Sequence, residues 1–373
     1  MSEKPPAPNS IPFRSSAKRP GSFLFSILTG VIAFIAIVVF AEAAFHNSAV
    51  EKRIPLRSLG SFHAQFEIKW FKLEDYVRQN GGVDVILLGN SMVNTGIDPA
   101  VMAEEYQART GKRLRIFNFG VEGLTIAPLS DLARILADRY HPGTILLFTE
   151  MRDYVAANGL AVENQFRADA WMRGQLGNAS LKGMLIDRSL LLQHLLPLRN
   201  WSRADFIDHF FMDLRRFDET SASGYEADRN IGENIEQAPN PNDPNEKLNF
   251  ELFSNFHMDA SRIQDLEKIL ALKDQGVTAL VTEIPVYPTY YVYFGGESVH
   301  QEYLKELSQI LGGASDQFLP AIPDILIPIS GRADNHHLNY EGAPLYSTLR
   351  AQSLADLCKQ QSICLNPSGG SQP

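Results

Sequence analysis

Twenty consecutive residues without a charge, Ser22 to Ala41, constrain this chain more than any other feature of its sequence. An α-helix rises ~1.5 Å per residue, so a helix of this length spans the ~30 Å hydrocarbon core of a bilayer. A buried core helix of a soluble protein rarely lacks a polar face over so many turns. The sequence therefore predicts one transmembrane helix over residues 21–45.

The residues that flank this run indicate its orientation. The segment before it is basic, with Glu3 its sole acidic residue, so the positive-inside rule places the N-terminus in the cytoplasm. Ala41-Glu42-Ala43 resembles a signal-peptide cleavage site, but signal peptides usually have an apolar region of only ~7–15 residues. We therefore predict an uncleaved single-pass anchor with the rest of the chain outside the cytoplasm, facing the periplasm in a bacterial inner membrane. The basic residues are Lys4, Arg14, Lys18 and Arg19.

Charge and cysteine content exclude several classes of protein. The formal charge is −9, from 34 Lys+Arg and 43 Asp+Glu, so the chain lacks the broad basic surface of nucleic-acid-binding proteins, and we expect no such partner. Two cysteines, Cys358 and Cys364, are too few for a disulfide-built miniprotein or a Cys-rich zinc module. An oxidising compartment would permit a disulfide between them, whereas a continuing helix would splay them apart. The sequence leaves both states open.

From residue 83 onward, short apolar runs alternate with amphipathic helical patterns. This alternation predicts an α/β fold, in which a parallel sheet is covered by helices on both faces. Asp98-Pro99 opens the first of these helices, because proline fits the first helical turn. The predicted strands are 83–88, 114–119, 144–148, 277–284 and 325–327, and the predicted helices are 99–110, 128–140, 261–275, 299–311 and 340–358.

Composition divides the remaining chain into smaller parts. The regular alternation stops between about 160 and 260, which indicates an insertion made of an apolar helical cap and a flexible loop, Asp218 to Lys247. That loop is rich in Asn, Pro, Asp, Glu and Gly and cannot bury much surface. The other predicted parts are a disordered cytoplasmic tail (1–20), a helical stalk that packs onto the domain (46–80), the α/β domain (81–358) and a flexible tail (359–373).

Polar and small residues follow the predicted strands, where ligands bind to open parallel sheets. Gly89-Asn90-Ser91 follows the first strand and leads into a helix, so the Ser91 hydroxyl would lie near backbone N–H groups that can stabilise an oxyanion. The alternative is that Ser91 merely caps a helix or turn. Asn118 to Gly123 follows the second strand, and its glycines permit a close backbone approach or a tight turn.

A third polar segment, Asp334 to Asn339, stands directly before the last helix. An aspartate three residues before a histidine can accept the imidazole N–H, which leaves the other ring nitrogen to take a proton from serine. A polar loop with unrelated groups is the alternative. A metal site formed by Asp334, His336 and His337 is disfavoured, because we expect adjacent histidines to point apart.

Together these segments resemble the SGNH/GDSL hydrolase superfamily. The resemblance covers roughly residues 83–155 and 277–358. It implies a flavodoxin-like three-layer sandwich with about five parallel strands and no cofactor. It also implies a set of residue roles: Ser91 as the nucleophile, His337 as the base, Asp334 as its orienting acid, Gly123 with Ser91 as N–H donors to the oxyanion, and Asn118 as part of the substrate-binding block.

The third block departs from the family pattern, since Arg152 takes the place of an oxyanion-donating asparagine. Arg152 would either donate in its stead or pair with Glu150 or Asp153. Membrane-tethered relatives that handle acyl groups on cell-envelope polymers depart in the same block. The resemblance therefore predicts an extracytoplasmic serine acyl-ester hydrolase or O-acyltransferase that acts on an acylated carbohydrate, with an acyl-donating membrane partner. A catalytically silent glycan-binding or scaffold protein is the alternative.

Overall fold

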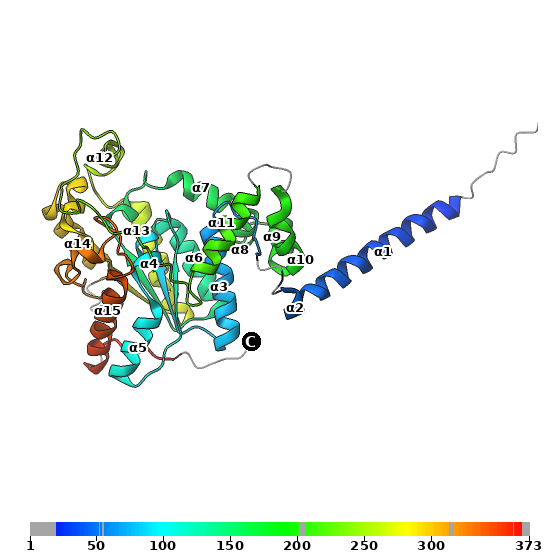
Figure 1. Cartoon of the computed structure of the whole chain (residues 1–373), viewed down its shortest axis with the longest axis horizontal. Coiled ribbons are helices and arrows are strands. Elements are labelled where there is room, and N and C mark those ends of the chain that lie inside the picture. The colour runs from blue at the N-terminus through cyan, green and yellow to red at the C-terminus, as the bar shows by residue number, and fades with distance from the viewer. Residues whose placement is uncertain are drawn as a thin grey trace, which may run out of the picture. The chain divides into compact units, whose positions relative to one another are not determined.

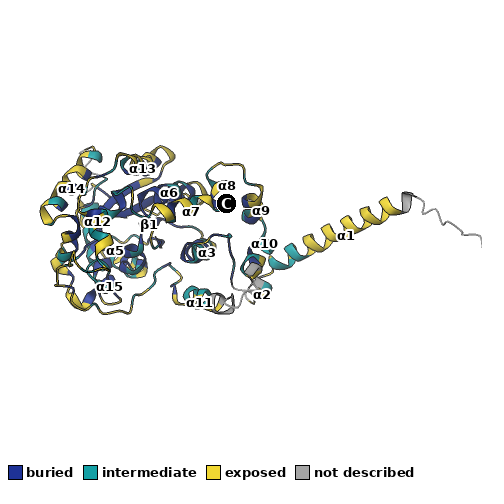
Figure 2. Ribbon diagram, turned by 90° about the horizontal axis from the view of Figure 1, so that it is seen from above, coloured by how far each residue is buried: buried dark blue, intermediate teal, exposed yellow. Residues whose placement is uncertain are grey.

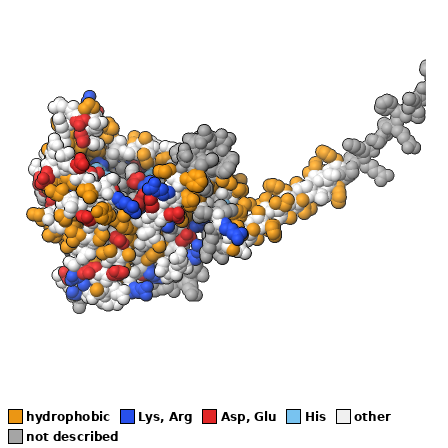
Figure 3. Space-filling view, in the orientation of Figure 1, with side chains coloured by type: hydrophobic (Ala, Val, Ile, Leu, Met, Phe, Trp, Pro, Cys, Tyr) orange, Lys and Arg blue, Asp and Glu red, His pale blue; other side chains and the backbone are white. Residues whose placement is uncertain are grey.

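The computed structural model describes residues 20–51, 53, 56–200, 206–312, 317–360 and 362–367. It divides into two compact units, residues 1–55 and 56–373. The first unit contains helix α1 (Pro20–Phe45) and the short helix α2 (Ser48–Glu51). Within α1, Phe23–Phe45 is long and apolar enough to cross a membrane, and its side chains are largely exposed (Figure 3). The predicted tail 1–20 lies outside the described residues except for Pro20, which begins α1.

The second unit is built on a parallel sheet, as predicted. Its strands follow the order β2-β1-β3-β4, with Val85 paired to both Ile116 and Thr144. Because both faces are covered by helices, the strands are almost entirely buried and apolar. The strands are β1 (Val85–Gly89), β2 (Ile116–Gly120), β3 (Thr144–Thr149) and β4 (Thr278–Glu283).

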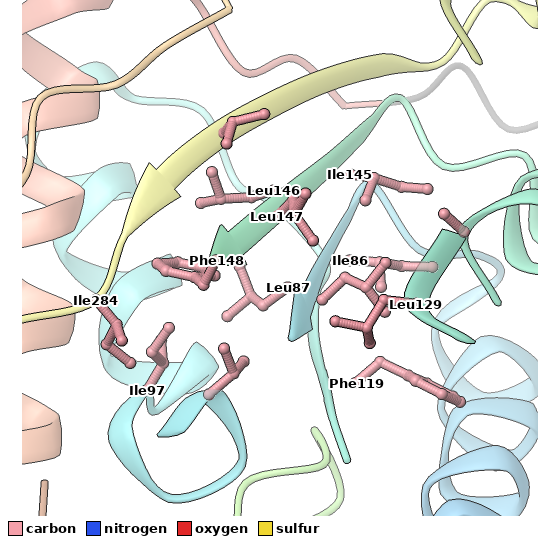
Figure 4. Packing of buried hydrophobic residues seen from close by; sticks show 14 of the residues in the cluster. Ile86, Leu87, Ile97, Phe119, Leu129, Ile145, Leu146, Leu147, Phe148 and Ile284 are labelled. Atoms are coloured by element: carbon pink, nitrogen blue, oxygen red, sulfur yellow. The ribbon is translucent and has the colours of Figure 1, made fainter. Parts of the chain in front are cut away.

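Helices cover both faces of this sheet (Figures 1 and 2). Helices α6 and α13 pack together on one face, and α5 and α15 pack together on the other. Figure 4 shows the division, because Ile86 lies beside Phe119 and Leu129 on one side of β1, whereas Leu87 points toward Ile97 on the other. The helices of the sandwich are α4 (Ser91–Gly96), α5 (Pro99–Thr110), α6 (Ile126–Tyr140), α13 (Ala260–Leu270), α14 (Glu297–Ile310) and α15 (Gly342–Lys359).

The predicted fifth strand, 325–327, is wrong. Residues Asp324–Leu326 form a 3₁₀ turn, η5, and the Ile325 side chain is exposed. Prolines at 320, 323 and 328 surround this run and cannot donate the hydrogen bonds of a ladder. Instead, a single parallel bridge joins Phe318 to Val281 beside β4.

The predicted stalk, 46–80, is helical over Ala64–Asn80 and packs onto the domain as expected, but its domain boundary is misplaced. Helix α3 (Ala64–Asn80) buries Phe66, Trp70 and Leu73 in the core of the second unit. These residues are four and then three apart, so they share one face of the helix. The α/β unit therefore begins at Leu56 rather than at residue 81.

The predicted insertion contains several short helices and a long irregular segment. Part of the loop predicted to be flexible is docked instead, because the Ser223 carbonyl accepts the Asn118 N–H at 2.8 Å and the buried Lys69 ammonium donates to the Gly224 carbonyl. The amino-acid composition of a segment does not indicate whether its main chain forms such hydrogen bonds. The helices are α7 (Leu160–Ala168), α8 (Ala170–Gln175), α9 (Leu181–Arg188), α10 (Leu190–Leu195), α11 (Phe206–Glu219) and α12 (Lys247–Phe253).

The C-terminal segment is also more ordered than predicted. Cys358 and Cys364 form a disulfide, which is one of the two states that the sequence left open. Ile363 and Leu365 are buried in the core, so the predicted flexible tail is wrong for residues 363–365. Residues 361 and 368–373 lie outside the described residues. The remaining 3₁₀ elements are η1 (Met151–Tyr154), η2 (Leu196–Asn200), η3 (Ala271–Gln275), η4 (Pro288–Phe294) and η6 (Ile329–Gly331).

Candidate active site

Ser91 lies where β1 ends and α4 begins. The Asn90 side chain caps α4 by accepting the Met92 N–H at 2.9 Å, so Ser91 is the first residue of the helix. Gly89 makes this sharp turn possible, because a Cβ at its position would lie 2.3 Å from Val93 Cγ2. The Ser91 hydroxyl is thereby held at the carboxyl edge of the sheet, where ligands bind in this class of fold.

The three residues predicted to form a triad lie in one hydrogen-bonded row. Ser91 Oγ is 2.8 Å from His337 Nε2, and His337 Nδ1 is 2.8 Å from Asp334 Oδ2. The second Asp334 oxygen accepts the His337 backbone N–H at 2.7 Å. Burial tends to raise the pKa of Asp334, but the hydrogen bonds from His336 and His337 outweigh it and hold this pKa well below its usual range. Asp334 is therefore ionised at neutral pH.

A buried arginine holds the loop that carries this row. Arg332 is fully buried, donates to the carbonyls of Pro285 and Asp324, and forms a bridge with Leu338. Asn339 reinforces the turn by donating to the Arg332 carbonyl at 3.2 Å. The position of His337 is thus fixed by backbone contacts before any substrate is bound.

A cleft of about 120 Å³ opens beside Ser91. Gly123 lines it with a left-handed φ of 68°, a conformation that favours glycine. Among the described residues, no acceptor is found for the backbone N–H of either Ser91 or Gly123. Both residues line the cleft. The cleft is lined by Asn90, Ser91, Gly123, Leu124, Thr125, Glu150, Arg152, Asp153 and Asn158.

Two side chains of the α3 region hold the turn that carries Gly123. Gln65 accepts the Glu122 N–H at 2.6 Å, and the His63 ring Nε2 lies 2.9 Å from the Glu122 carbonyl. Gln65 also donates to the Glu122 carboxylate at 3.2 Å. The segment predicted as a stalk therefore positions part of the candidate site.

Asn118 does not reach the cleft, which corrects its predicted role in substrate binding. Its side-chain amide donates to the carbonyls of Val93 and Ile97, both at 2.7 Å, and its oxygen accepts the Gly120 N–H at 2.9 Å. Asn118 is fully buried, so these bonds occupy its polar atoms. It fastens the end of α4 to β2 and supports Ser91 only indirectly.

Arg152 lines the cleft but pairs with a carboxylate. Its Nε donates to Glu150 Oε1 at 2.7 Å, and its guanidinium carbon lies 5.5 Å from the centre of the Tyr290 ring. Burial opposes the charged form, yet Glu150 and Tyr290 raise the pKa of Arg152 above its ordinary value. Of the two predicted alternatives, the structure contains the ion pair.

A buried polar cluster surrounds this pair. Asn90 donates to Glu150 and to Asp153, each at 3.3 Å, and the Tyr290 hydroxyl donates to Glu150. Burial, followed by the nearby charge of Glu150, raises the pKa of Asp153 to about 8. Burial and the neighbouring Glu150 carboxylate therefore favour the neutral form of Asp153.

Thr125 and Asn158 line the cleft and were not predicted from the sequence. The Thr125 hydroxyl is buried and has no hydrogen-bond partner among the described residues, and Asn158 donates to the Arg152 carbonyl at 3.0 Å. Gly159 lets these segments meet, since a Cβ there would lie 3.0 Å from Thr125 Cγ2. Asn158-Gly159 is a typical turn pair, but nothing in the sequence indicates which surface the turn faces.

His336 does not point away from His337, which corrects the argument used against a metal site. The centres of the two rings lie 4.0 Å apart. The candidate ligand atoms of Asp334, His336 and His337 lie within 4.8 Å of one another. The His336 ring also stacks on Tyr290, with centres 5.2 Å apart. Burial and the charges of His337 and Arg152 lower the pKa of His336 to about 4. In the structure, the Nδ1 atoms of both histidines lie within hydrogen-bonding distance of Asp334.

Comparison with known proteins adds little to this picture. No known family model matches the chain, and no curated protein sequence matches it. Among solved structures, it is similar to a gut microbial diltiazem-metabolizing enzyme, with 13% sequence identity over 73% of this chain and a TM-score of 0.22. The chain spans 47% of the length of that structure. A likeness this distant carries no argument about fold or activity.

Proposed function

We propose that this chain is a membrane-anchored serine acyl-ester hydrolase or O-acyltransferase of the kind that the SGNH/GDSL resemblance implies. The hydrogen-bonded row Ser91–His337–Asp334, next to a cleft lined by Ser91 and Gly123, the two proposed N–H donors, is the observation that carries the proposal. These are the parts that acyl transfer through a serine requires: a nucleophile, an oriented base and oxyanion donors.

In the proposed reaction, Ser91 Oγ attacks the ester carbonyl while His337 Nε2 takes its proton. Asp334 accepts the Nδ1–H of the ring, which fixes the tautomer and stabilises the imidazolium. The negative charge on the former carbonyl oxygen falls near the N–H groups of Ser91 and Gly123. When the ester bond breaks, the leaving alcohol receives the proton from His337, and water or a sugar hydroxyl then resolves the acyl-enzyme by the reverse steps.

The substrate class follows from the proposed location. With the N-terminus in the cytoplasm, the second unit works outside it, where acylated carbohydrates of the cell envelope or exopolysaccharides are available. The disulfide between Cys358 and Cys364 supports an oxidising compartment. An acyl-donating membrane partner would supply the acyl group if the reaction is a transfer.

A glycan-binding or scaffold role is the second candidate. It is favoured by the Arg152–Glu150 ion pair, because this arginine is engaged where the related enzymes present an oxyanion donor. On this account the cleft binds a sugar ester without cleaving it.

Hydrolysis of a chromogenic acetyl ester by the full chain in detergent, with and without an acceptor glycan, tests the proposal. An esterase releases the chromophore in both cases, and a transferase releases it faster when the acceptor is present. Release at the rate of a Ser91→Ala variant under both conditions would favour the binding role.

A further inference from the structure

We propose that the outward face of α9, continued by the end of α10 and by η2, rests on the surface of the membrane that α1 crosses. We call this surface the α9–α10 face and define it by five exposed apolar residues and two basic residues. They are Leu181, Met184, Leu185, Leu195, Leu198, Lys182 and Arg188. The ligand is a lipid surface, and the inference is independent of any acyl chemistry.

Helix α9 has its apolar side turned outward. Leu181 is 70% exposed, and Met184 and Leu185 are each 50% exposed. Their spacing of three and four residues places them on one side of the helix, whereas Ile186 is buried on the other. A helix on the surface of a soluble domain normally buries its apolar stripe and exposes polar residues. The arrangement in α9 therefore calls for an apolar or interfacial environment.

The orientation of α9 is fixed by tight packing. Gly183 lies against α8 so closely that a Cβ at its position would be 2.1 Å from the Ala170 carbonyl oxygen. Ser180 caps the helix by accepting the Gly183 N–H at 3.0 Å. The helix cannot turn its leucines inward without losing this contact. The outward apolar face is thus a built feature of the domain.

The neighbouring helix α10 is bonded to the first residues of the second unit. The Ser58 N–H donates to the Gln193 carbonyl at 2.9 Å, and His194 Nδ1 lies 3.2 Å from the Leu56 carbonyl. Only ten residues, 46–55, separate Leu56 from the end of α1 at Phe45. Helix α10 therefore lies beside the residues at which the linker from α1 enters the second unit.

The charges on the α9–α10 face also fit a membrane. Lys182 and Arg188 are exposed on α9. Asp187 is the sole acidic residue between 181 and 198, and it is engaged by Arg139 at 2.8 Å and by the Trp171 indole N–H at 2.9 Å. The face is therefore basic in a chain whose formal charge is −9. Apolar residues flanked by Lys and Arg are typical of helices that lie in the headgroup region of anionic bilayers.

The test uses the full chain, one copy per nanodisc of phosphatidylethanolamine and phosphatidylglycerol, with its disulfide left intact. A single cysteine, Leu185→Cys, carries an environment-sensitive fluorophore, and lipids with a quenching group on the acyl chain are included in the disc. Leu248→Cys on α12 is the matched control, because Leu248 is a leucine of the same unit that is 62% exposed. A third sample combines the label at 185 with Lys182→Glu and Arg188→Glu.

We expect severalfold stronger quenching and a blue-shifted emission for the label at 185 than for the label at 248. The two charge reversals should weaken the quenching at 185 in these anionic discs. Equal quenching at both positions, at the level found in lipid-free detergent, would overturn the proposal. Shielding of the label at 185 only in discs that hold two copies would also overturn it, because the face would then bind a second copy of the chain.

Discussion

Two polar clusters flank Ser91, and they shift the pKa values of their aspartates in opposite directions. Asp334 lies at the partly exposed edge, accepts bonds from two histidines, and has its pKa held well below the usual range. Asp153 is buried beside Glu150, and its pKa is raised to about 8. Asn90 contacts the second cluster while its neighbour Ser91 contacts the first.

The two clusters differ in the groups that they offer for proton transfer. The Asp334 cluster combines a charged carboxylate with an imidazole whose far nitrogen faces a hydroxyl. In the Glu150–Asp153 cluster, in contrast, the Glu150 carboxylate already accepts hydrogen bonds from Arg152, Asn90 and Tyr290. We therefore expect changes in the first cluster to act on turnover and changes in the second to act mainly on stability.

The largest expected effect comes from the first cluster. His337→Ala and Asp334→Ala should each lower the ester-cleavage rate by ~10³-fold or more, because a triad works as a unit. The unfolding temperature of each variant should stay close to that of the unaltered chain, and steady-state kinetics with thermal unfolding measure both quantities. Asp334→Asn should cost less, since the loop still positions the imidazole. Loss of folding in the alanine variants would show that this cluster is structural.

Arg152→Ala should lower the stability of the chain more than its turnover. Removing it leaves Glu150 buried without its cation, which should cost about 3 kcal/mol, the low end for a broken buried pair, since 23% of the Arg152 side chain is exposed. Arg215→Ala is the matched control, because the Arg215–Glu219 pair is exposed and should contribute ~0–1 kcal/mol. Denaturant unfolding compares the two. A 10²–10³-fold loss of turnover with unchanged stability would instead identify Arg152 as an oxyanion donor.

The raised pKa of Asp153 makes the stability of the second cluster depend on pH. In the unfolded chain Asp titrates near ~3.9, whereas in the folded chain Asp153 holds its proton up to a pH of about 8. The folded state binds more protons between these values, so this contribution is complete below pH ~4 and is lost as the pH rises through about 8. Thermal unfolding from pH 5 to pH 9 should show a decline that Asp153→Asn flattens. An identical decline in the variant would contradict the assignment.

The smallest effect is expected at His336, which joins the two clusters. Its ring stacks on Tyr290 of the second cluster, and its Nδ1 lies 3.0 Å from Asp334 Oδ1 of the first cluster. His336→Ala should lower turnover less than tenfold, because the backbone N–H of residue 336 still donates to Asp334. His336→Phe keeps the stacking and should recover stability but not turnover. Recovery of both by Phe would show that only the stacking matters.

Apolar runs and short motifs were enough to predict the four strands and the three residues that the structure joins in one row. The four strands follow apolar runs, and Ser91, Asp334 and His337 stand in short motifs after strands or before a helix. The end of β1 places Ser91 at the edge of the sheet, whereas Asp334 and His337 are brought there by the turn that Arg332 and Asn339 hold. Periodicity failed at residues 325–327, because an apolar run interrupted by prolines reads like a strand but cannot form a ladder.

Features that depend on contacts between distant segments were not predictable. Asn118 belongs to a block that the resemblance links to substrate, yet its amide is used by carbonyls at 93 and 97. Residues 220–226 are polar and resemble a free loop, but they dock through the Ser223 carbonyl and the buried Lys69. Thr125 and Asn158 meet at the cleft only because Gly159 permits close packing. Neither composition nor spacing encodes such pairings.

Labelling by a fluorophosphonate probe tests most directly whether Ser91 is an activated nucleophile. The probe reacts with a serine hydroxyl only when a neighbouring base and oxyanion donors assist it. We expect the folded full chain to be labelled, the label to map to the peptide containing Ser91, and Ser91→Ala and His337→Ala to abolish it. Absence of labelling in the folded chain, or equal labelling of Ser91→Ala, would show that Ser91 is not an activated nucleophile and would leave the binding role in its place.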